Sequence, residues 1–177
     1  IVKADVTRKS GRDKVGKCLE KLKRDLDILV CNVGSGSSVA PGSEDRTDWD
    51  RSFEINFFST VSMISCLRPY FSSNNGCILC ISSICGEAVI KGAPLTYSVA
   101  KAALNAYIKG ASVPLSEDGI RINGITPGNI LHKNSVWRSK LQENDDSVKN
   151  YLNSNVVLRR LGKPEEVAKL TLLLASD

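Results

Sequence analysis

Short, continuous apolar runs alternate along this chain with longer stretches of helical periodicity. Each run predicts a buried strand, because a strand covered on both faces has no polar side. The runs are IVKA (1–4, the end of a strand), DILVC (27–31), CILCIS (77–82) and IRINGIT (120–126). The predicted helices lie at 11–25, from Thr47 or Asp48 to about residue 71, at 95–117 and at 163–175. The polar stretch from 129 to about 160 shows one weaker helix near 146–153.

Strands and helices in regular alternation predict an α/β fold with a doubly wound parallel sheet. The length of 177 residues suits one domain, and we see no internal repeat or linker. We therefore expect a single domain over residues 1–177. In such sheets ligands bind beyond the carboxyl ends of the strands.

Charge and cysteine content exclude several classes of protein. The net charge of +5 is mild. Eight basic residues surround the first predicted helix without interleaved aromatic residues, so we expect a solvated face and no nucleic-acid binding. They are Arg8, Lys9, Arg12, Lys14, Lys17, Lys21, Lys23 and Arg24. No apolar run reaches membrane-spanning length, so we expect no membrane association.

The six cysteines favour a reducing compartment, and we expect a cytoplasmic protein. Cys77 and Cys80 lie three apart on a predicted strand, so they should face opposite sides of the sheet. With His132 as the only histidine, we expect core thiols and no metal site.

Polar residues follow the predicted strands at one edge of the sheet. Asp5, Asn32 with Gly34, Ser82 or Ser83, and Pro127-Gly128 all belong to this set. Tyr97 and Lys101 stand four apart on the helix after the Ser82-Ser83 strand, so they share one helix face. A nearby cation favours a phenolate and should lower the pKa of the tyrosine. Alone, this spacing also fits a tyrosine resting on a lysine stem.

Six motifs in order resemble the short-chain dehydrogenase/reductase family over essentially the whole chain. They are DVT (5–7), LVCNVG (29–34), INFFST (55–60), ISSICG (81–86), YSVAK (97–101) and PGNI (127–130). The resemblance implies a Rossmann-type fold and hydride transfer between NAD or NADP and a small alcohol or carbonyl compound. A 3-oxoacyl reductase and a sugar or polyol dehydrogenase both remain open. The resemblance also implies a homodimer or homotetramer. Candidates for the subunit interface are apolar side chains of the two long helices, namely Phe53, Phe57, Val61, Ile64, Leu104 and Ile108.

The resemblance assigns roles to single residues. Tyr97 would be the acid in reduction and the base in oxidation, Lys101 would lower its pKa and bind the nicotinamide ribose, and Ser83 would polarise the substrate oxygen. Asn56 would anchor a water that links Lys101 to solvent. The remaining cofactor contacts would come from Asp5, Val6, Asn32, Gly34, Pro127, Gly128 and Ile130. The alternatives are a helix cap for Ser83, a polar helix-kink residue for Asn56, and a catalytically silent binding, regulatory or structural protein.

Two departures from the family pattern lead to further expectations. The glycine-rich pyrophosphate turn and the last strand have no counterpart in the sequence, so we expect a fragment that lacks the first βαβ segment. DILVC would then be a bare apolar edge, and the chain alone would fold poorly. His132 stands where a threonine commonly meets the nicotinamide carboxamide, and its protonation should weaken binding of the oxidised cofactor.

Overall fold

A computed structural model describes residues 1–72 and 75–176 of the chain. Its sheet contains β1 (Ile28–Cys31), β2 (Gly76–Ile81) and β3 (Ile120–Ile125) in the order β1-β2-β3. Both pairings are parallel, with Ile28 opposite Cys77 and Gly76 opposite Ile120. The three internal strands and the parallel α/β fold are confirmed.

The strand predicted at residues 1–4 is wrong. This segment forms no strand, and Ile1 to Lys3 are exposed. No backbone hydrogen bond joins it to another strand among the described residues, and the Lys3 carbonyl instead accepts from the Lys14 ammonium at 2.9 Å. An apolar run becomes a strand only where a neighbouring strand satisfies its backbone groups.

Seven α-helices account for most of the remaining described chain. They are α1 (Lys9–Leu22), α2 (Arg46–Phe53), α3 (Ser59–Leu67), α4 (Leu95–Ser116), α5 (Val136–Glu143), α6 (Asp145–Asn155) and α7 (Pro164–Ala175). A π-helical turn at Glu54–Phe58 joins α2 to α3, and short 3₁₀ turns lie at Arg68–Tyr70 and Ile84–Gly86.

Helix α1 begins two residues before its predicted range of 11–25, and α2 and α5 also differ from the sequence prediction. Asp45, not Thr47 or Asp48, caps α2: its carboxylate accepts from the Asp48 amide at 2.9 Å, and the Asp48 carboxylate accepts from the Asp45 amide at 3.1 Å. This reciprocal pair satisfies two amides that the helix leaves free, so it fixes the start earlier. Helix α5 was not predicted; Ser135 caps it by accepting from the Arg138 amide at 3.2 Å.

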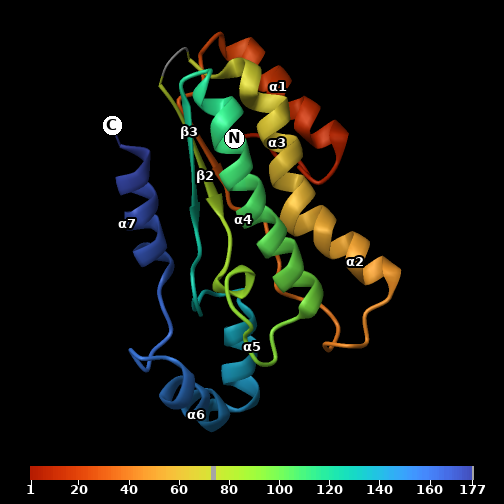
Figure 1. Ribbon diagram of the computed structural model, residues 1–177, viewed down its shortest axis with the longest axis vertical. Helices are drawn as coiled ribbons and strands as arrows, with labels where there is room; N and C mark the ends of the chain where they lie inside the picture. Colours follow the sequence, from red (N-terminus) through yellow and green to blue (C-terminus); the bar gives the residue numbers. More distant parts are fainter. Residues whose placement is uncertain (73–74, 177) are drawn as a thin grey trace.

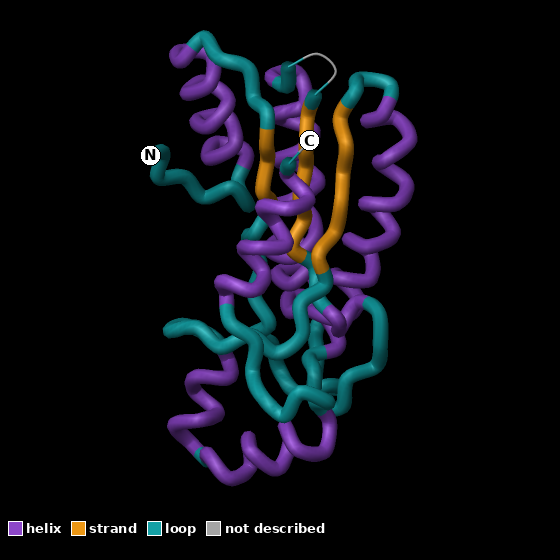
Figure 2. Tube along the Cα trace, turned by 90° about the vertical axis from the view of Figure 1, so that its left-hand side faces the viewer, coloured by secondary structure: helices purple, strands orange, loops and turns teal. Residues whose placement is uncertain are grey.

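The helices form unequal layers on the two faces of the sheet. In Figure 1, α1, α3 and α4 lie on one side of the strands and α7 on the other. The buried core lies between the sheet and the first group, around Ile64, Ile78, Cys80 and Leu104. Figure 2 shows the three strands side by side, with α5 and α6 beyond their carboxyl ends.

The expectation that DILVC is covered on both faces is wrong for β1. Its burial alternates: Cys31 is 7% exposed, but Ile28 and Val30 are 46% and 44% exposed. Ile28 and Val30 point to the face opposite α4, where among the described residues only α7 contributes a helix, and α7 contacts β2 and β3.

The cysteines behave as the strand geometry predicted. Cys77 donates its thiol to the Leu174 carbonyl of α7 at 3.5 Å, whereas Cys80 packs in the core on the α4 side, beside Cys31. All six cysteines are free thiols. Burial and the Cys31 thiol raise the pKa of Cys80, which keeps this thiol protonated.

The helix residues considered for a subunit interface are partly core residues. Ile64, Leu104 and Ile108 are at most 8% exposed inside this chain, so they offer no surface to a second copy. Phe53, Phe57 and Val61 are half-buried and remain candidates. The reason is that the long helices turn more of their apolar residues toward the sheet than the pattern suggested.

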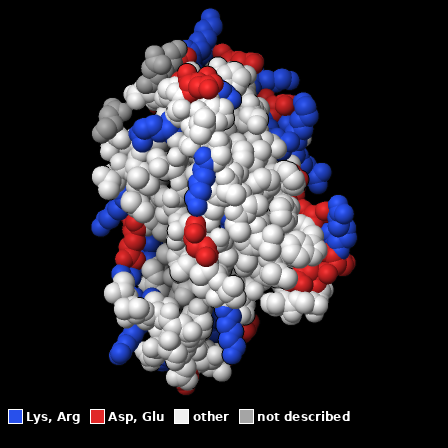
Figure 3. Space-filling model, viewed as in Figure 1, with Lys and Arg blue, Asp and Glu red and all other residues white. Residues whose placement is uncertain are grey.

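Basic side chains gather over α1 with acidic ones among them in Figure 3. Seven of the eight basic residues around this helix are exposed, as expected for a solvated face. Arg12 is the exception: its guanidinium is partly buried and donates to the Val6 and Thr7 carbonyls, each at 2.8 Å. No helix in the described chain combines the length and apolar character needed to cross a membrane.

Candidate active site

Tyr97 and Lys101 share one face of the first turns of α4. Pro94, whose backbone is extended, precedes the helix, so Tyr97 is held at its start beside the carboxyl end of β2. The Lys101 ammonium lies 5.9 Å from the centroid of the Tyr97 ring and donates to the Ile81 carbonyl at 2.8 Å. Lys101 is only 2% exposed. The predicted juxtaposition is therefore present, and the last carbonyl of β2 holds the lysine in place.

Burial dominates the electrostatics of this pair. Burial raises the pKa of Tyr97, and the hydrogen bond with the Ser83 hydroxyl opposes that shift only in part. Burial also lowers the pKa of Lys101 to about 8. The expectation of a lowered tyrosine pKa is wrong in this structure, because the ammonium sits over the ring and desolvation outweighs its charge.

Ser83 lies two residues beyond the end of β2 and is buried. Its hydroxyl accepts from the Cys85 amide at 3.2 Å, so it caps the short turn Ile84–Gly86. The same hydroxyl bonds to Tyr97, so the helix-cap interpretation and the site interpretation both describe it.

Gly86 allows the turn after Ser83 to lie against α4. A methyl group at this position would stand 2.6 Å from the Lys101 carbonyl carbon and 2.8 Å from the Ala102 amide nitrogen. Backbone atoms at such distances cannot accommodate a side chain without a shift of one element. The close approach therefore sets the position of Ser83 relative to Lys101.

Asn56 occupies the π-helical turn and is 1% exposed. Its amide oxygen accepts from the Ser35 amide at 2.8 Å, and its amide nitrogen donates to the Ser35 and Ser52 carbonyls at 3.0 and 3.1 Å. Asn56 therefore ties the loop after β1 to the helix. It does not line the cavity described next.

A cavity of about 1130 Å³ opens beyond the carboxyl ends of the strands. Ser83, Tyr97 and Lys101 lie in its wall, and so do the following predicted cofactor residues: Asn32, Gly34, Pro127, Gly128 and Ile130. His132 also faces it. The His132 Nδ1 accepts from the Asn134 amide at 3.3 Å, so the neutral ring carries its proton on Nε2.

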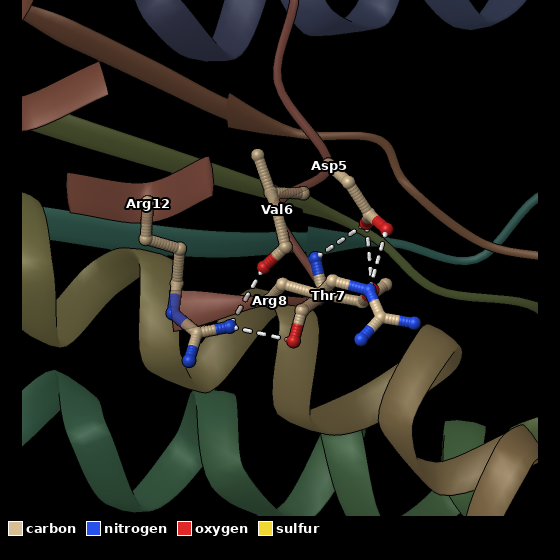
Figure 4. Close-up of polar contacts among 5 residues, drawn as sticks. All are labelled: Asp5, Val6, Thr7, Arg8 and Arg12. Atoms are coloured by element: carbon tan, nitrogen blue, oxygen red, sulfur yellow. Dashed lines mark hydrogen bonds and ion pairs between the residues drawn. The ribbon is translucent and has the colours of Figure 1, made fainter. Parts of the chain in front are cut away.

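Asp5 and Val6 are not among the residues that line this cavity. Figure 4 shows the turn that holds them: the Asp5 carboxylate accepts from the Thr7 amide at 3.1 Å and from the Thr7 hydroxyl at 2.6 Å, with Arg8 beside it at 3.5 Å. These contacts, led by the Thr7 hydroxyl, lower the pKa of Asp5. The structure thus brings seven of the nine predicted cofactor residues to the cavity and leaves these two apart from it.

The architecture and site place the chain within a known group of proteins. A family model described as enoyl-(acyl carrier protein) reductase matches residues 1–177. The chain belongs to the short-chain dehydrogenase/reductase family. Four of the six motifs that suggested this family contribute residues to the cavity: those at 29–34, 81–86, 97–101 and 127–130.

Relatives within the family differ widely in activity. Isoepoxydon dehydrogenase patN of Penicillium expansum is 30% identical over 174 residues, which are 97% of this chain and 65% of that protein. The 3-oxoacyl-[acyl-carrier-protein] reductase FabG of Chlamydia trachomatis is 32% identical over 155 residues, 86% of this chain and 59% of that protein. The chain thus spans less than two thirds of the length of either relative.

A solved structure agrees on the fold. The chain resembles the complex of Pseudomonas aeruginosa RhlG with NADP at a TM-score of 0.88 and 27% identity, over 98% of this chain and 68% of that one.

Sequence reasoning named Ser82 but missed its partners and a second group of site residues. The Ser82 hydroxyl donates to Asn105 at 2.5 Å, and Asn105 donates to Glu87 at 2.7 Å, which braces α4 against the Ser83 turn. The second group, Trp137, Lys140 and Tyr151, lines the cavity from α5 and α6. Two aromatic residues and a cation within an otherwise polar stretch were the available signal for the second group.

Proposed function

We propose that this chain carries the catalytic part of an NAD(P)-dependent oxidoreductase that interconverts a secondary alcohol and a carbonyl. The observation that carries the proposal is the convergence of the Tyr97 phenol, the Ser83 hydroxyl and the Lys101 ammonium in one cavity. A proton donor beside a hydrogen-bonding hydroxyl is what carbonyl reduction requires of a protein. Both a 3-oxoacyl compound and a sugar or polyol remain possible substrates.

The residues at the cavity suit a nicotinamide dinucleotide. Asn32, Gly34, Pro127 and Gly128 come from strand ends, where this fold class binds nucleotides. A methyl group at Gly34 would lie 3.2 Å from the Asn56 oxygen and 3.3 Å from the Lys101 nitrogen, so the bare backbone there leaves room that a side chain would fill. When bound, the nicotinamide supplies or accepts the hydride. Asp5 and Val6 would be more distant contacts.

Tyr97 moves the proton in this proposal. In reduction its phenol Oη donates to the carbonyl oxygen as that oxygen becomes an alkoxide, and in oxidation the phenolate takes the proton back. Ser83 holds the same oxygen through its hydroxyl. The raised pKa of Tyr97 keeps the phenol protonated at neutral pH, which suits the reduction direction. Lys101 contributes its charge and its hydrogen-bond donors, and it is fixed by the Ile81 carbonyl.

Asn56 acts as a positioning residue in this proposal. Its amide fixes the loop at Ser35, and Gly34 of the same loop lies beside Lys101. The proposed water relay from Lys101 to solvent would use the backbone of this turn, because the side-chain amide is already engaged.

The test uses the complete protein with NADH and NADPH against a panel of ketones, followed by nicotinamide absorbance. Tyr97→Phe keeps the ring but removes the only proton it can transfer, so turnover should fall by about 10²–10⁴-fold with cofactor affinity nearly unchanged. Tyr107→Phe, which alters a half-buried tyrosine of the same helix, is the control and should retain activity. Near-native turnover of Tyr97→Phe at saturating cofactor would overturn the proposal.

A further inference from the structure

The lining of the cavity carries charge of one sign. Three lysines contribute to it: Lys91, Lys101 and Lys140. The chain contains 19 acidic residues, yet none of the described ones lines this cavity. Glu87, whose turn adjoins the lining, is engaged by Asn105, and Glu166 is engaged by Arg160 and the Lys163 amide. A cavity of this kind raises the local concentration of anions.

Among the lysines of this lining, Lys140 has an ammonium group that is both held in a defined position and accessible to a ligand. Lys101 is buried and bonded to the Ile81 carbonyl, and Lys91 lies on an exposed loop. The Lys140 ammonium is held 4.9 Å from the centroid of the Trp137 ring, one turn away on α5. Within the described chain no carboxylate pairs with Lys140, so its charge is not neutralised.

Trp137 in turn packs against Tyr151 of α6, with ring centroids 5.1 Å apart and planes inclined by 38°. Both rings line the cavity, so α5 and α6 present an aromatic wall with a cation at its edge. These helices lie beyond the carboxyl ends of the strands (Figures 1 and 2). An aromatic wall beside an uncompensated cation is complementary to a molecule with an apolar body and an anionic end.

We propose that the carbonyl substrate carries an anionic group on an apolar body, with Lys140 receiving the anion and Trp137 and Tyr151 packing against the body. This inference rests on the proposed function, since it names the substrate class of the same site. Lys140 is then a specificity-determining residue: it discriminates between substrates without touching the proton that Tyr97 transfers.

Binding is tested separately from turnover. In the complete protein carrying Trp49→Phe, the fluorescence of Trp137 reports on the cavity wall. The probes are 4-oxo-4-phenylbutanoate and its methyl ester, which differ in charge but share the ketone and the ring. We expect the acid to bind more tightly than the ester by about two- to fivefold at low salt, as for a single exposed ion pair, and less so at high salt.

Three variants assign this preference to one side chain. Lys140→Met should remove it, Lys140→Arg should restore it, and Lys133→Met should leave it intact, because Lys133 is exposed nearby but does not line the cavity. Equal binding of acid and ester by the wild type, or a preference that survives in Lys140→Met, would overturn the inference. So would a Lys140→Met effect that weakens NADH or NADPH binding but not binding of the acid.

The same probes distinguish failure of the inference from failure of the proposed function. Preferential binding of the acid without turnover of any ketone would support the anion site and contradict the oxidoreductase. Turnover of both ketones with equal kcat/KM would support the oxidoreductase and contradict the anion site.

Discussion

The two faces of the sheet differ in how completely this chain covers them. On the α4 face, Ile78 and Leu104 are fully buried, and Lys101 and Ser83 each have a hydrogen-bond partner in the backbone. On the opposite face, Val30 is 44% exposed and Leu172 of α7 is 75% exposed. Ser83, Tyr97 and Lys101 thus lie against the well-packed α4 face, whereas part of the cavity wall comes from helices that are largely exposed.

This difference separates two kinds of requirement. Proton transfer tolerates little error in position, and the residues proposed for it lie on α4 (Tyr97 and Lys101) and at the turn between β2 and α4 (Ser83). Substrate choice tolerates variation, and the residues proposed for it lie on α5 and α6, which are short and largely exposed. In the proposed function, the well-packed α4 face carries the residues of the reaction, and the more exposed α5 and α6 carry those of substrate choice.

The largest expected difference between the two faces is in stability, and one leucine substitution on each face measures it. Leu104→Ala removes a fully buried side chain of α4 and should lower the free energy of unfolding by about 2–5 kcal/mol. Leu172→Ala in the same chain should change it by at most about 0.5 kcal/mol. Urea unfolding of both variants measures this. A large loss in Leu172→Ala would show that the α7 face is buried in solution.

Two glycines of the α4 face sharpen the comparison at the level of the backbone. Gly86→Ala should cost about 1–3 kcal/mol and lower kcat in the complete enzyme, because the added methyl group pushes the Ser83 turn off α4. Gly110→Ala is the matched control: no atom lies within 4 Å of its added methyl group, and it should stabilise the helix by about 0.4–1 kcal/mol. Thermal melts and single-turnover rates test both, and equal behaviour would mean that the turn is not held by this contact.

The buried lysine gives the smallest effect and a pH signature. Burial lowers the pKa of Lys101 to about 8 from the model-compound value of 10.5. Between these values the unfolded chain holds a proton that the folded chain has lost, so this group stabilises the fold increasingly as pH rises through the window. The difference in melting temperature, wild type minus Lys101→Met, should therefore rise by a few degrees from pH 7 to pH 10. Lys109→Met, which removes an exposed lysine of the same helix, controls for loss of a lysine. A constant difference across this range would contradict the burial of a charged Lys101.

The local sequence pattern was sufficient to predict the elements whose observed burial agrees with their hydrophobic periodicity. Three continuous apolar runs gave β1, β2 and β3, and the spacing of Tyr97 and Lys101 gave their shared face. Pattern failed at residues 1–4, because a strand depends on a partner that lies elsewhere in the chain. It failed at α5, whose eight residues are too few for a clear period and whose start depends on the Ser135 cap.

The sequence predicted which residues form the site better than it predicted their pKa values. Ser83 and the strand-end residues came from order and family resemblance, and all of them except Asp5 line the cavity. The pKa of Tyr97 could not be predicted, because its direction depends on how deeply the ring is buried and where the ammonium sits. The role of Asn56 in holding Ser35 also depends on a contact between residues 21 positions apart.

The π-helical turn at Glu54–Phe58 determines how α3 is rotated relative to α2. Such a turn holds one residue more than an α-helical turn, and each residue advances a helix by about 100°. Helix α3 therefore meets α1 with a face that an uninterrupted helix would have turned away, while Asn56 points at the loop instead. Deleting a single residue within the turn would barely shorten the continuous helix, but it would rotate α3 by about 100° and turn its contact residues away from α1.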